Sequence, residues 1–275
     1  MKKIFACLLL SSAALVMIYP LLWLLGASFK TNDEIFSSIW FMPPRIEMSV
    51  YGKAWQTVTP YTMGHYFLNT FKIIIPKTAF TVLSSVLVAY GFARFDFPFR
   101  RLFFALLMCS MFMPSIVTLL PTYLMWNGTG LINTYVPLTL PALFACEGSF
   151  VFILIQFFKG VPKEFDEASK IDGCGALGTL FYILIPCIKP AVISIAVFTF
   201  LWTMNDFLTP LMMIHSVEKY PISLALRLSV DSTGQGYEQR SIIAMSVIGL
   251  IPSIAVFSLA QKKFVSGITM GGLSG

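Results

Sequence analysis

The sequence predicts an all-α, polytopic membrane protein built as a single transmembrane domain over residues 1–275. Of its 275 residues, 57% are hydrophobic and only 12% are charged, about half the charged fraction of an average soluble chain. Six runs are also long enough to cross a bilayer as helices, for which about 20 apolar residues are needed. We expect these spans at about residues 4–29, 69–93, 102–126, 135–158, 189–214 and 241–260.

The first apolar run follows two lysines and extends from Ile4 to Phe29. A cleaved signal peptide is the alternative interpretation, but no A-x-A site follows a short apolar core, and the run is long enough to span. We therefore expect an uncleaved first span with the N-terminus inside. Residues 30–68 and 215–240 are then polar loops on the outer side, and residues 30–68 are expected to fold on the membrane surface.

The middle spans contain prolines that predict irregular helices. Pro114 lies inside the span at residues 102–126, where a kink is expected. Pro137 and Pro141 lie near the start of the span at residues 135–158, which is expected to begin as a broken helix.

Basic residues predict the orientation of the spans. The short loops on the side of the N-terminus carry a higher density of lysine and arginine than the long loops on the other side, which marks the first side as cytoplasmic. Both chain ends and the loop at residues 159–186 are therefore expected inside the cell. The basic residues on that side are Lys2, Lys3, Arg94, Arg100, Arg101, Lys159, Lys163, Lys170, Lys262 and Lys263.

Composition argues against several other classes of protein. The five cysteines show no paired spacing, and an odd number does not suit a disulfide framework. The two histidines, His65 and His215, are far apart, so neither a metal cluster nor a catalytic triad is predicted. The formal charge of +6 is assigned to cytoplasmic loops, and no nucleic-acid partner is expected.

Residues 160–173 interrupt the apolar pattern and predict a short amphipathic helix. Pro162 suits the first helical position, and Gly173 suits the left-handed residue that ends a helix. Glu164 and Glu167 lie in the first turns, where the helix dipole favours negative charge. Such a helix is either a solvated connector or a handle that a partner outside the lipid can hold.

Neither of two common nucleotide-binding motifs predicts a site in this chain. Residues 173–178 match G-x-G-x-x-G, but they follow a helix rather than a strand, so a dinucleotide site is not predicted. The sequence contains no G-x-x-x-x-G-K-[ST] motif, so it has no ATP site of that type.

The loop at residues 159–186 resembles the EAA loop of the membrane permeases of bacterial ABC importers. The resemblance rests on Glu167-Ala168-Ser169, Gly173, Ile183 and Pro186, with Ser169 in place of the second alanine and Ile185 in place of a leucine. Further segments are similar to carbohydrate permeases of the maltose type, and together the similarity covers residue 89 to the C-terminus. These segments are residues 90–101, 130–135, 156–158, 202–210 and 264–272.

This resemblance implies the permease subunit of an ATP-driven carbohydrate importer, with an oligosaccharide as the expected substrate and alternating access as the mechanism. The implied partners are a second homologous permease subunit, a cytoplasmic ATPase dimer, an external solute-binding protein and membrane lipid. No cofactor is expected in this chain, because ATP and Mg²⁺ would be bound by the partner ATPase. The tail at residues 261–275 is expected to enter the ATPase dimer. Coupling to the ATPase is expected at Glu164, Glu167, Ala168, Ser169, Asp172 and Gly173.

Ionisable residues inside predicted spans are candidates for function. Lys77 either lines a solute pathway or extends toward the interface, and Asp206 is interpreted first as a residue that bonds helix to helix. Glu147 is assigned to a pathway or an ion pair, because an unpaired carboxylate in lipid costs about 3 kcal/mol on insertion scales. The resemblance adds Trp202 and Asn205 to these pathway candidates.

Two other classes of protein stay open. A stand-alone secondary transporter or channel would need internal repeats and broken helices near the middle of the membrane, and no internal symmetry is evident. An intramembrane enzyme would need a convergent nucleophile and base, and no histidine falls within the predicted bundle.

Overall fold

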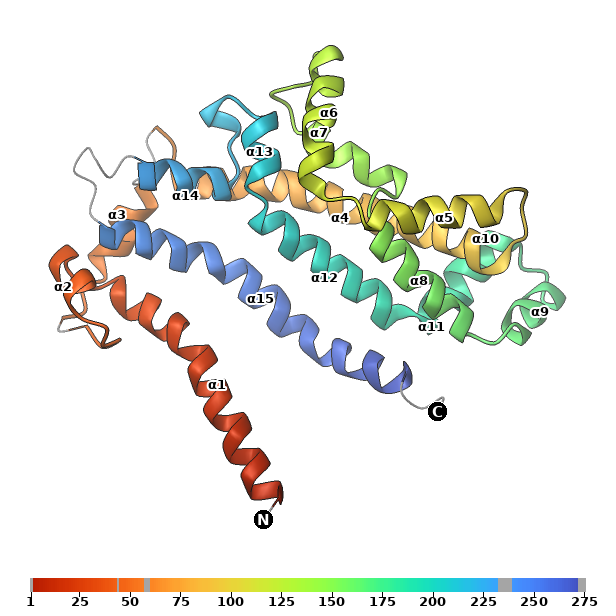
Figure 1. Cartoon of the computed structure of the whole chain (residues 1–275), viewed down its shortest axis with the longest axis horizontal. Helices are drawn as coiled ribbons and strands as arrows, with labels where there is room; N and C mark the ends of the chain where they lie inside the picture. Colours follow the sequence, from red (N-terminus) through yellow and green to blue (C-terminus); the bar gives the residue numbers. More distant parts are fainter. Residues whose placement is uncertain (1, 44, 57–59, 232–238, 272–275) are drawn as a thin grey trace. The chain divides into compact units, whose positions relative to one another are not determined.

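A computed structural model of the chain describes residues 2–43, 45–56, 60–231 and 239–271. These residues form helices and connecting turns, and no strand occurs among them (Figure 1). Four helical segments have the length and composition of membrane spans, and two bent helix pairs raise the number to six if each pair is one span. The predicted all-α, polytopic fold is therefore confirmed.

The chain divides into two compact units, and the first joins the N-terminal 68 residues to residues 220–252. Its helices are α1 (Lys2–Ala27), α2 (Asn32–Ser37), α3 (Ser49–Gln56) and α14 (Ile222–Asp231), with the beginnings of α4 and α15. Thr31 and Glu34 form a capping box at the start of α2. The buried Lys30 ammonium donates to the carbonyls of Ser38 and Trp40, so the segment after α1 is folded, as predicted.

The second unit contains residues 69–219 and the chain from residue 253 onward. Within it, α8 packs against α5 and α12 (Figure 1). Gly148 permits the contact with α5, because a Cβ there would lie 2.9 Å from the Ser110 hydroxyl and 3.4 Å from the Leu107 carbonyl. The elements are α4 (Met63–Arg94), α5 (Arg100–Met111), α6 (Ser115–Gly128), α7 (Val136–Thr139), η1 (Leu140–Phe144), α8 (Gly148–Gly160), α9 (Glu164–Ile171), α10 (Ala176–Gly178), the π-helical η2 (Thr179–Leu184), α11 (Ile185–Cys187), α12 (Lys189–Asn205), α13 (Leu208–Met213) and η3 (Val217–Lys219).

Pro114 breaks the helix of its span, which is a stronger effect than the predicted kink. α5 and α6 meet at 104° around Pro114, which stands in extended backbone before α6 and has no N–H with which to continue α5. The predicted span at residues 102–126 is therefore a bent pair. The segment at residues 136–160 begins with the short α7 and η1, as its prolines predict, and Ala145 is left-handed just before α8.

The last two predicted spans also differ in extent. α12 ends at Asn205, and Asp206 and Phe207 separate it from α13, so the predicted span at residues 189–214 is divided. Residues 176–187 meet α12 at 83°. The helix α15 (Gln239–Gly271) continues past residue 260 into the segment predicted as a tail, and residues 272–275 lie outside the described residues.

Candidate functional site

The helix α9 is the short amphipathic helix that the sequence predicts within residues 160–173. It begins at Glu164, with Lys163 as its capping residue. Pro162 thus lies before the cap and does not take the first helical position, which corrects the sequence prediction. Its carbonyl accepts the Phe165 N–H at 3.4 Å, so it belongs to the turn that leads into the helix.

Gly173 ends α9 in the left-handed conformation that was predicted. Its φ is +80°, and its N–H donates to the Lys170 carbonyl at 3.1 Å. The next N–H, of Cys174, donates to the Ser169 carbonyl at 2.9 Å. These two bonds form a Schellman motif, which satisfies carbonyl groups that the helix end would otherwise leave unpaired.

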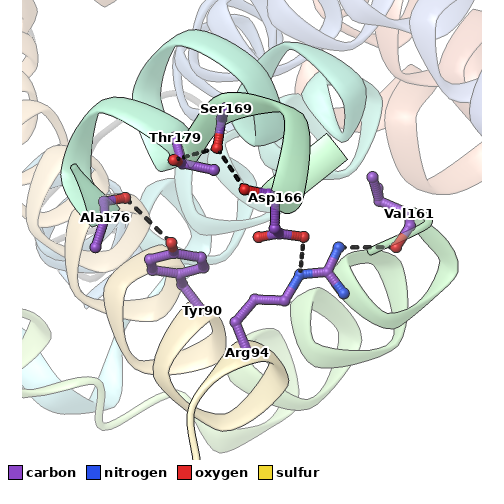
Figure 2. A network of polar contacts seen from close by, with 7 residues as sticks. All are labelled: Tyr90, Arg94, Val161, Asp166, Ser169, Ala176 and Thr179. Atoms are coloured by element: carbon purple, nitrogen blue, oxygen red, sulfur yellow. Dashed lines mark hydrogen bonds and ion pairs between the residues drawn. The ribbon is translucent and has the colours of Figure 1, made fainter. Parts of the chain in front are cut away.

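A buried ion pair attaches α9 to the end of α4. The Arg94 Nε lies 3.0 Å from Asp166 Oδ2, and the side chains are only 6% and 17% exposed (Figure 2). The two atoms do not align as a hydrogen bond, so charge attraction holds them together. The same guanidinium donates to the Val161 carbonyl at 2.7 Å. Arg94 therefore joins the end of α4 to the C-terminal end of α8 and to α9.

Two further contacts fix the chain that follows α9. The Ser169 and Thr179 hydroxyl oxygens are 2.8 Å apart, and Ser169 also donates to the Asp166 carbonyl at 2.8 Å (Figure 2). The Tyr90 hydroxyl of α4 donates to the Ala176 carbonyl at 3.1 Å. Together with the ion pair, these contacts hold one face of α9 and the chain after it against α4 and η2.

Ser169 does not lie where the sequence prediction placed it. It is 1% exposed and faces its own chain, so it is not part of a docking surface. The other predicted coupling residues are exposed, and the apolar Phe165 and Ile171 are exposed beside them. We call this set the outer face of α9; it consists of Glu164, Phe165, Glu167, Ala168, Ile171, Asp172 and Gly173. Apolar side chains among carboxylates, uncovered on a helix that is fixed from behind, are typical of a surface for a protein partner.

A cavity of about 380 Å³ lies elsewhere in the second unit; its wall is largely apolar but includes three charged and four hydroxyl-bearing residues, and for these we call it the polar cavity. Lys77 of α4, Glu147 at the start of α8 and Asp206 between α12 and α13 all line it, so the structure brings together the three predicted intramembrane charges. Hydroxyl groups add further donors and acceptors; they belong to Ser115, Thr118, Thr122 and Thr209. Such a lining can bind a solute that carries many hydroxyl groups.

The three charged residues of this cavity have different surroundings. Asp206 Oδ1 accepts the Thr209 N–H at 3.2 Å, so the carboxylate caps the first turn of α13. Lys77 and Glu147 are half-buried, and no ion pair joins them in the part of the chain that the structure describes. Charge is therefore available to a solute at these two positions.

The remaining pathway candidates, Trp202 and Asn205, do not line this cavity. Trp202 is 52% exposed and stacks on Phe150 with ring centroids 5.0 Å apart. The Asn205 amide donates to the Leu201 carbonyl of its own helix at 2.8 Å. Both residues belong to the last turn of α12, and the structure gives them packing and helix-end contacts.

Sequence reasoning missed the roles of Tyr90, Arg94 and Thr179. Arg94 was interpreted as one of the basic residues that set orientation and as part of the family-like segment at residues 90–101, and Asp166 was given no role. No periodicity links residues so distant in the chain. One signal was available in the sequence. Arg94, a basic residue, ends a predicted span, and the acidic loop at residues 159–186 is expected on the same side of the membrane.

Comparisons with known proteins agree on one family. Residues 81–269 match the family described as binding-protein-dependent transport system inner membrane component. The probable ABC transporter permease protein YurM of Bacillus subtilis is 31% identical over 94% of this chain and 84% of its own length. The diacetylchitobiose uptake system permease protein NgcG of Streptomyces coelicolor is 28% identical over the same shares.

Two further comparisons extend over nearly the whole chain. The arabinooligosaccharides transport system permease protein AraQ of Halalkalibacterium halodurans is 29% identical over 95% of this chain and 93% of its own. A chain in the crystal structure of a bacterial ABC transporter involved in the import of the acidic polysaccharide alginate superposes with a TM-score of 0.75. The two share 23% identity over 96% of each chain, which supports a common fold.

Proposed function

Because this chain belongs to the family of inner membrane components of binding-protein-dependent transport systems, we propose that it is the permease subunit of an ATP-driven carbohydrate importer. Similar permeases named for diacetylchitobiose, arabinooligosaccharides and galactooligosaccharides support an oligosaccharide as the solute. The structural observation that carries the proposal is the outer face of α9, exposed on a helix that a buried ion pair fixes to the rest of the unit. The family assignment disfavours a stand-alone secondary transporter or channel.

The energy for transport comes from a partner. The sequence contains no phosphate-binding G-x-x-x-x-G-K-[ST] loop, so ATP and Mg²⁺ would be held by an ATPase dimer that docks on the outer face of α9. The family description supports a solute-binding protein as the donor of the solute. A second, homologous permease subunit would complete the pathway across the membrane. In this assembly the chain acts as a transport subunit and carries out no hydrolysis itself.

Two helices, α4 and α8, connect α9 to the polar cavity. Arg94 connects α9 to α4 and α8, and each of these helices carries a cavity residue farther along its length. On α4 that residue is Lys77, and at the start of α8 it is Glu147. A displacement of α9 by the ATPase would therefore shift two walls of the cavity together. This arrangement suits alternating access, in which helices move as rigid bodies around a solute site.

A tagged chain, produced with its permease and ATPase partners, provides the test. We expect the ATPase to co-purify, and we expect the binding protein loaded with its oligosaccharide to stimulate ATP hydrolysis and uptake in proteoliposomes. Glu167→Lys reverses a charge on the outer face of α9 and should lower ATPase retention and uptake together. Asp33→Lys, an equal charge reversal at the exposed start of α2, serves as the control and should leave both unchanged. Solute uptake by the chain alone, without ATPase or ATP, would refute the proposal.

A further inference from the structure

A second cavity, of about 630 Å³, lies where α4 ends, α5 begins and α8 ends. Phenylalanine side chains from α4, α5 and the connection between them form much of its wall. The polar part of the wall consists of Arg100, Arg101, Lys159 and Asp96. None of these four residues takes part in the contacts of α9 or in the polar cavity.

The charges in this second cavity are not balanced. The Arg100 guanidinium pairs with Asp96 and donates to the Phe92 carbonyl at 2.6 Å. Among the described residues, Arg101 and Lys159 have no carboxylate partner. Three cations against one carboxylate leave the cavity with a formal charge of +2. The first turn of α5 contains no acidic residue and has no side-chain cap, so the helix dipole adds to the positive potential.

The wall of this cavity is rich in phenylalanine side chains, which come from Phe92, Phe97, Phe99 and Phe104. Phe99 is 73% exposed and is held at a φ of +62°. α5 together with α6 is one of the candidate membrane spans. A positive cavity with an aromatic wall at the start of a membrane span is suited to a ligand with an anionic head and hydrocarbon tails.

We propose that this cavity binds the head group of an anionic phospholipid. The phosphate would contact Arg101 and Lys159, while Arg100 remains paired with Asp96. The acyl chains would lie against the exposed Phe99 and the other phenylalanines of the cavity wall. A soluble phosphate compound satisfies the charge but not this aromatic wall, and for that reason the lipid is favoured. This inference requires only that the chain spans a membrane, and it does not depend on the solute or on the ATPase.

The test measures lipid binding to the purified transporter complex by its thermal unfolding in mild detergent. Added phosphatidylglycerol should raise the unfolding temperature in a saturable way, whereas phosphatidylcholine and inorganic phosphate should not. Arg101→Gln and Lys159→Gln should each raise the half-saturating phosphatidylglycerol concentration about fivefold, the effect of removing one basic residue near an anionic lipid. Lys189→Gln, at another exposed lysine that begins a helix, serves as the matched control and should bind like the unchanged protein.

Asp96→Asn keeps the test informative if the two loss-of-charge variants fail to assemble. The Asp96 side chain is 97% exposed, so its neutral form should fold, and removal of the one carboxylate should tighten phosphatidylglycerol binding. An equal response to inorganic phosphate would overturn the proposal in favour of a soluble anion. A Lys189→Gln effect as large as the others would mean unspecific surface charge. Unchanged lipid binding with loss of the ATPase from the Arg101 and Lys159 variants would assign the cavity to a protein contact.

Discussion

Arg94 makes contacts that no other residue in this region can replace. Its guanidinium is nearly buried and reaches Asp166 on one side and the Val161 carbonyl on the other. A lysine would carry all its donors on one atom, whereas the guanidinium reaches Asp166 with Nε and the Val161 carbonyl with a terminal nitrogen. The positions of the ends of α4 and α8 and of the helix α9 therefore depend on the Arg94 side chain and on the Asp166 carboxylate.

We expect Arg94→Gln and Asp166→Asn each to uncouple ATP hydrolysis from uptake. Either change leaves one largely buried charge of the ion pair without its partner, which costs on the order of 3 kcal/mol. The ATPase should still bind, because the outer face of α9 is unchanged, but uptake per ATP should fall. The double variant should be less impaired than the sum of the single effects. Hydrolysis and uptake in the same proteoliposomes measure the coupling.

The exposed pair of Asp96 and Arg100 provides the control for this comparison. Asp96 is almost fully exposed, and exposed ion pairs contribute about 0–1 kcal/mol. Asp96→Asn should therefore leave uptake per ATP unchanged. Strictly additive effects of Arg94→Gln and Asp166→Asn would argue that the two residues act separately, and the proposed connection through the ion pair would be wrong.

Glu147 is the second residue whose role can be tested directly. Glu147→Gln keeps the shape of the cavity wall and removes its charge, so we expect altered uptake or solute preference in a complex that still assembles. Since no ion pair joins Glu147 to Lys77 among the described residues, the Lys77→Gln variant should add to the effect almost independently. Asn205→Ala, outside the cavity lining, should leave solute preference unchanged. Unaltered transport by Glu147→Gln, with a more stable complex, would mean that the carboxylate has no part in the pathway.

At the scale of the elements, the end of α9 sets the direction of the loop that follows it. Gly173 has a left-handed φ of +80°, and a Cβ at this position would meet no atom within 4 Å. A substitution there is unfavourable because of backbone strain and not because of crowding. Gly173→Val should lower uptake and binding-protein-stimulated hydrolysis together, since a β-branched residue in this conformation costs about 1–3 kcal/mol.

Gly173→Asn distinguishes strain from loss of glycine itself. Asparagine tolerates the left-handed conformation better than any β-branched residue. This variant should retain most of the uptake that Gly173→Val loses. Equal losses in both variants would show that the backbone conformation at residue 173 is not what the loop requires.

Asn133 connects two loops that the sequence analysis treated separately. Its side-chain oxygen accepts the N–H groups of His215 and Ser216 at 3.1 and 3.0 Å, and its amide donates to the Ser216 hydroxyl at 2.7 Å. Asn133→Ala should lower stability by about 3 kcal/mol, at about 1 kcal/mol for each of three hydrogen bonds. Thermal unfolding of the purified complex measures the loss. Thr134→Val removes two local hydrogen bonds, one donated to the Leu131 carbonyl and one accepted from the Val136 N–H; it is the control and should cost less.

The sequence was sufficient to predict helices and the C-terminal end of α9, because these depend on local composition. Apolar length identifies a membrane segment, and Gly173 supplies a conformation that few other residues adopt. It was not sufficient to predict which face of α9 is buried. In α9, apolar and polar residues occur on both sides of the helix, so the pattern does not identify the buried side. The contacts with Thr179 and Arg94 place Ser169 inward and Phe165 outward. These partners meet only in the folded chain.

The breaks in the spans mark a second limit of sequence reasoning. Pro114 predicts irregularity, but the sequence does not show whether the helix kinks and continues or breaks, as it does here with a bend of 104°. Asp206 was assigned to the interior of a continuous span, yet it stands where α12 has ended and caps α13. Asp206 nevertheless lines one cavity together with Lys77 and Glu147, the two other charged residues assigned to spans.

At the scale of the whole molecule, the orientation in the membrane remains a prediction, and basic residues provide its physical basis. Six of them gather in one unit at the ends of α4 and α8 and around α5 and α9. Because lysine and arginine are retained on the cytoplasmic side, this end of the unit should face the cytoplasm, and α9 with it. The six are Arg94, Arg100, Arg101, Lys159, Lys163 and Lys170.

Single cysteines in a background without the five native ones test this orientation in intact cells. Lys163 is exposed beside α9, and Asp33 is exposed at the start of α2. The reagent is a maleimide that cannot cross membranes. Asp33→Cys should be labelled when the reagent reaches only the outer face of the cytoplasmic membrane. Lys163→Cys should be labelled only after that membrane has been permeabilised. The reverse pattern would place α9 outside the cell. A cytoplasmic ATPase could not reach it there, so that result would remove α9 as the point at which hydrolysis drives transport.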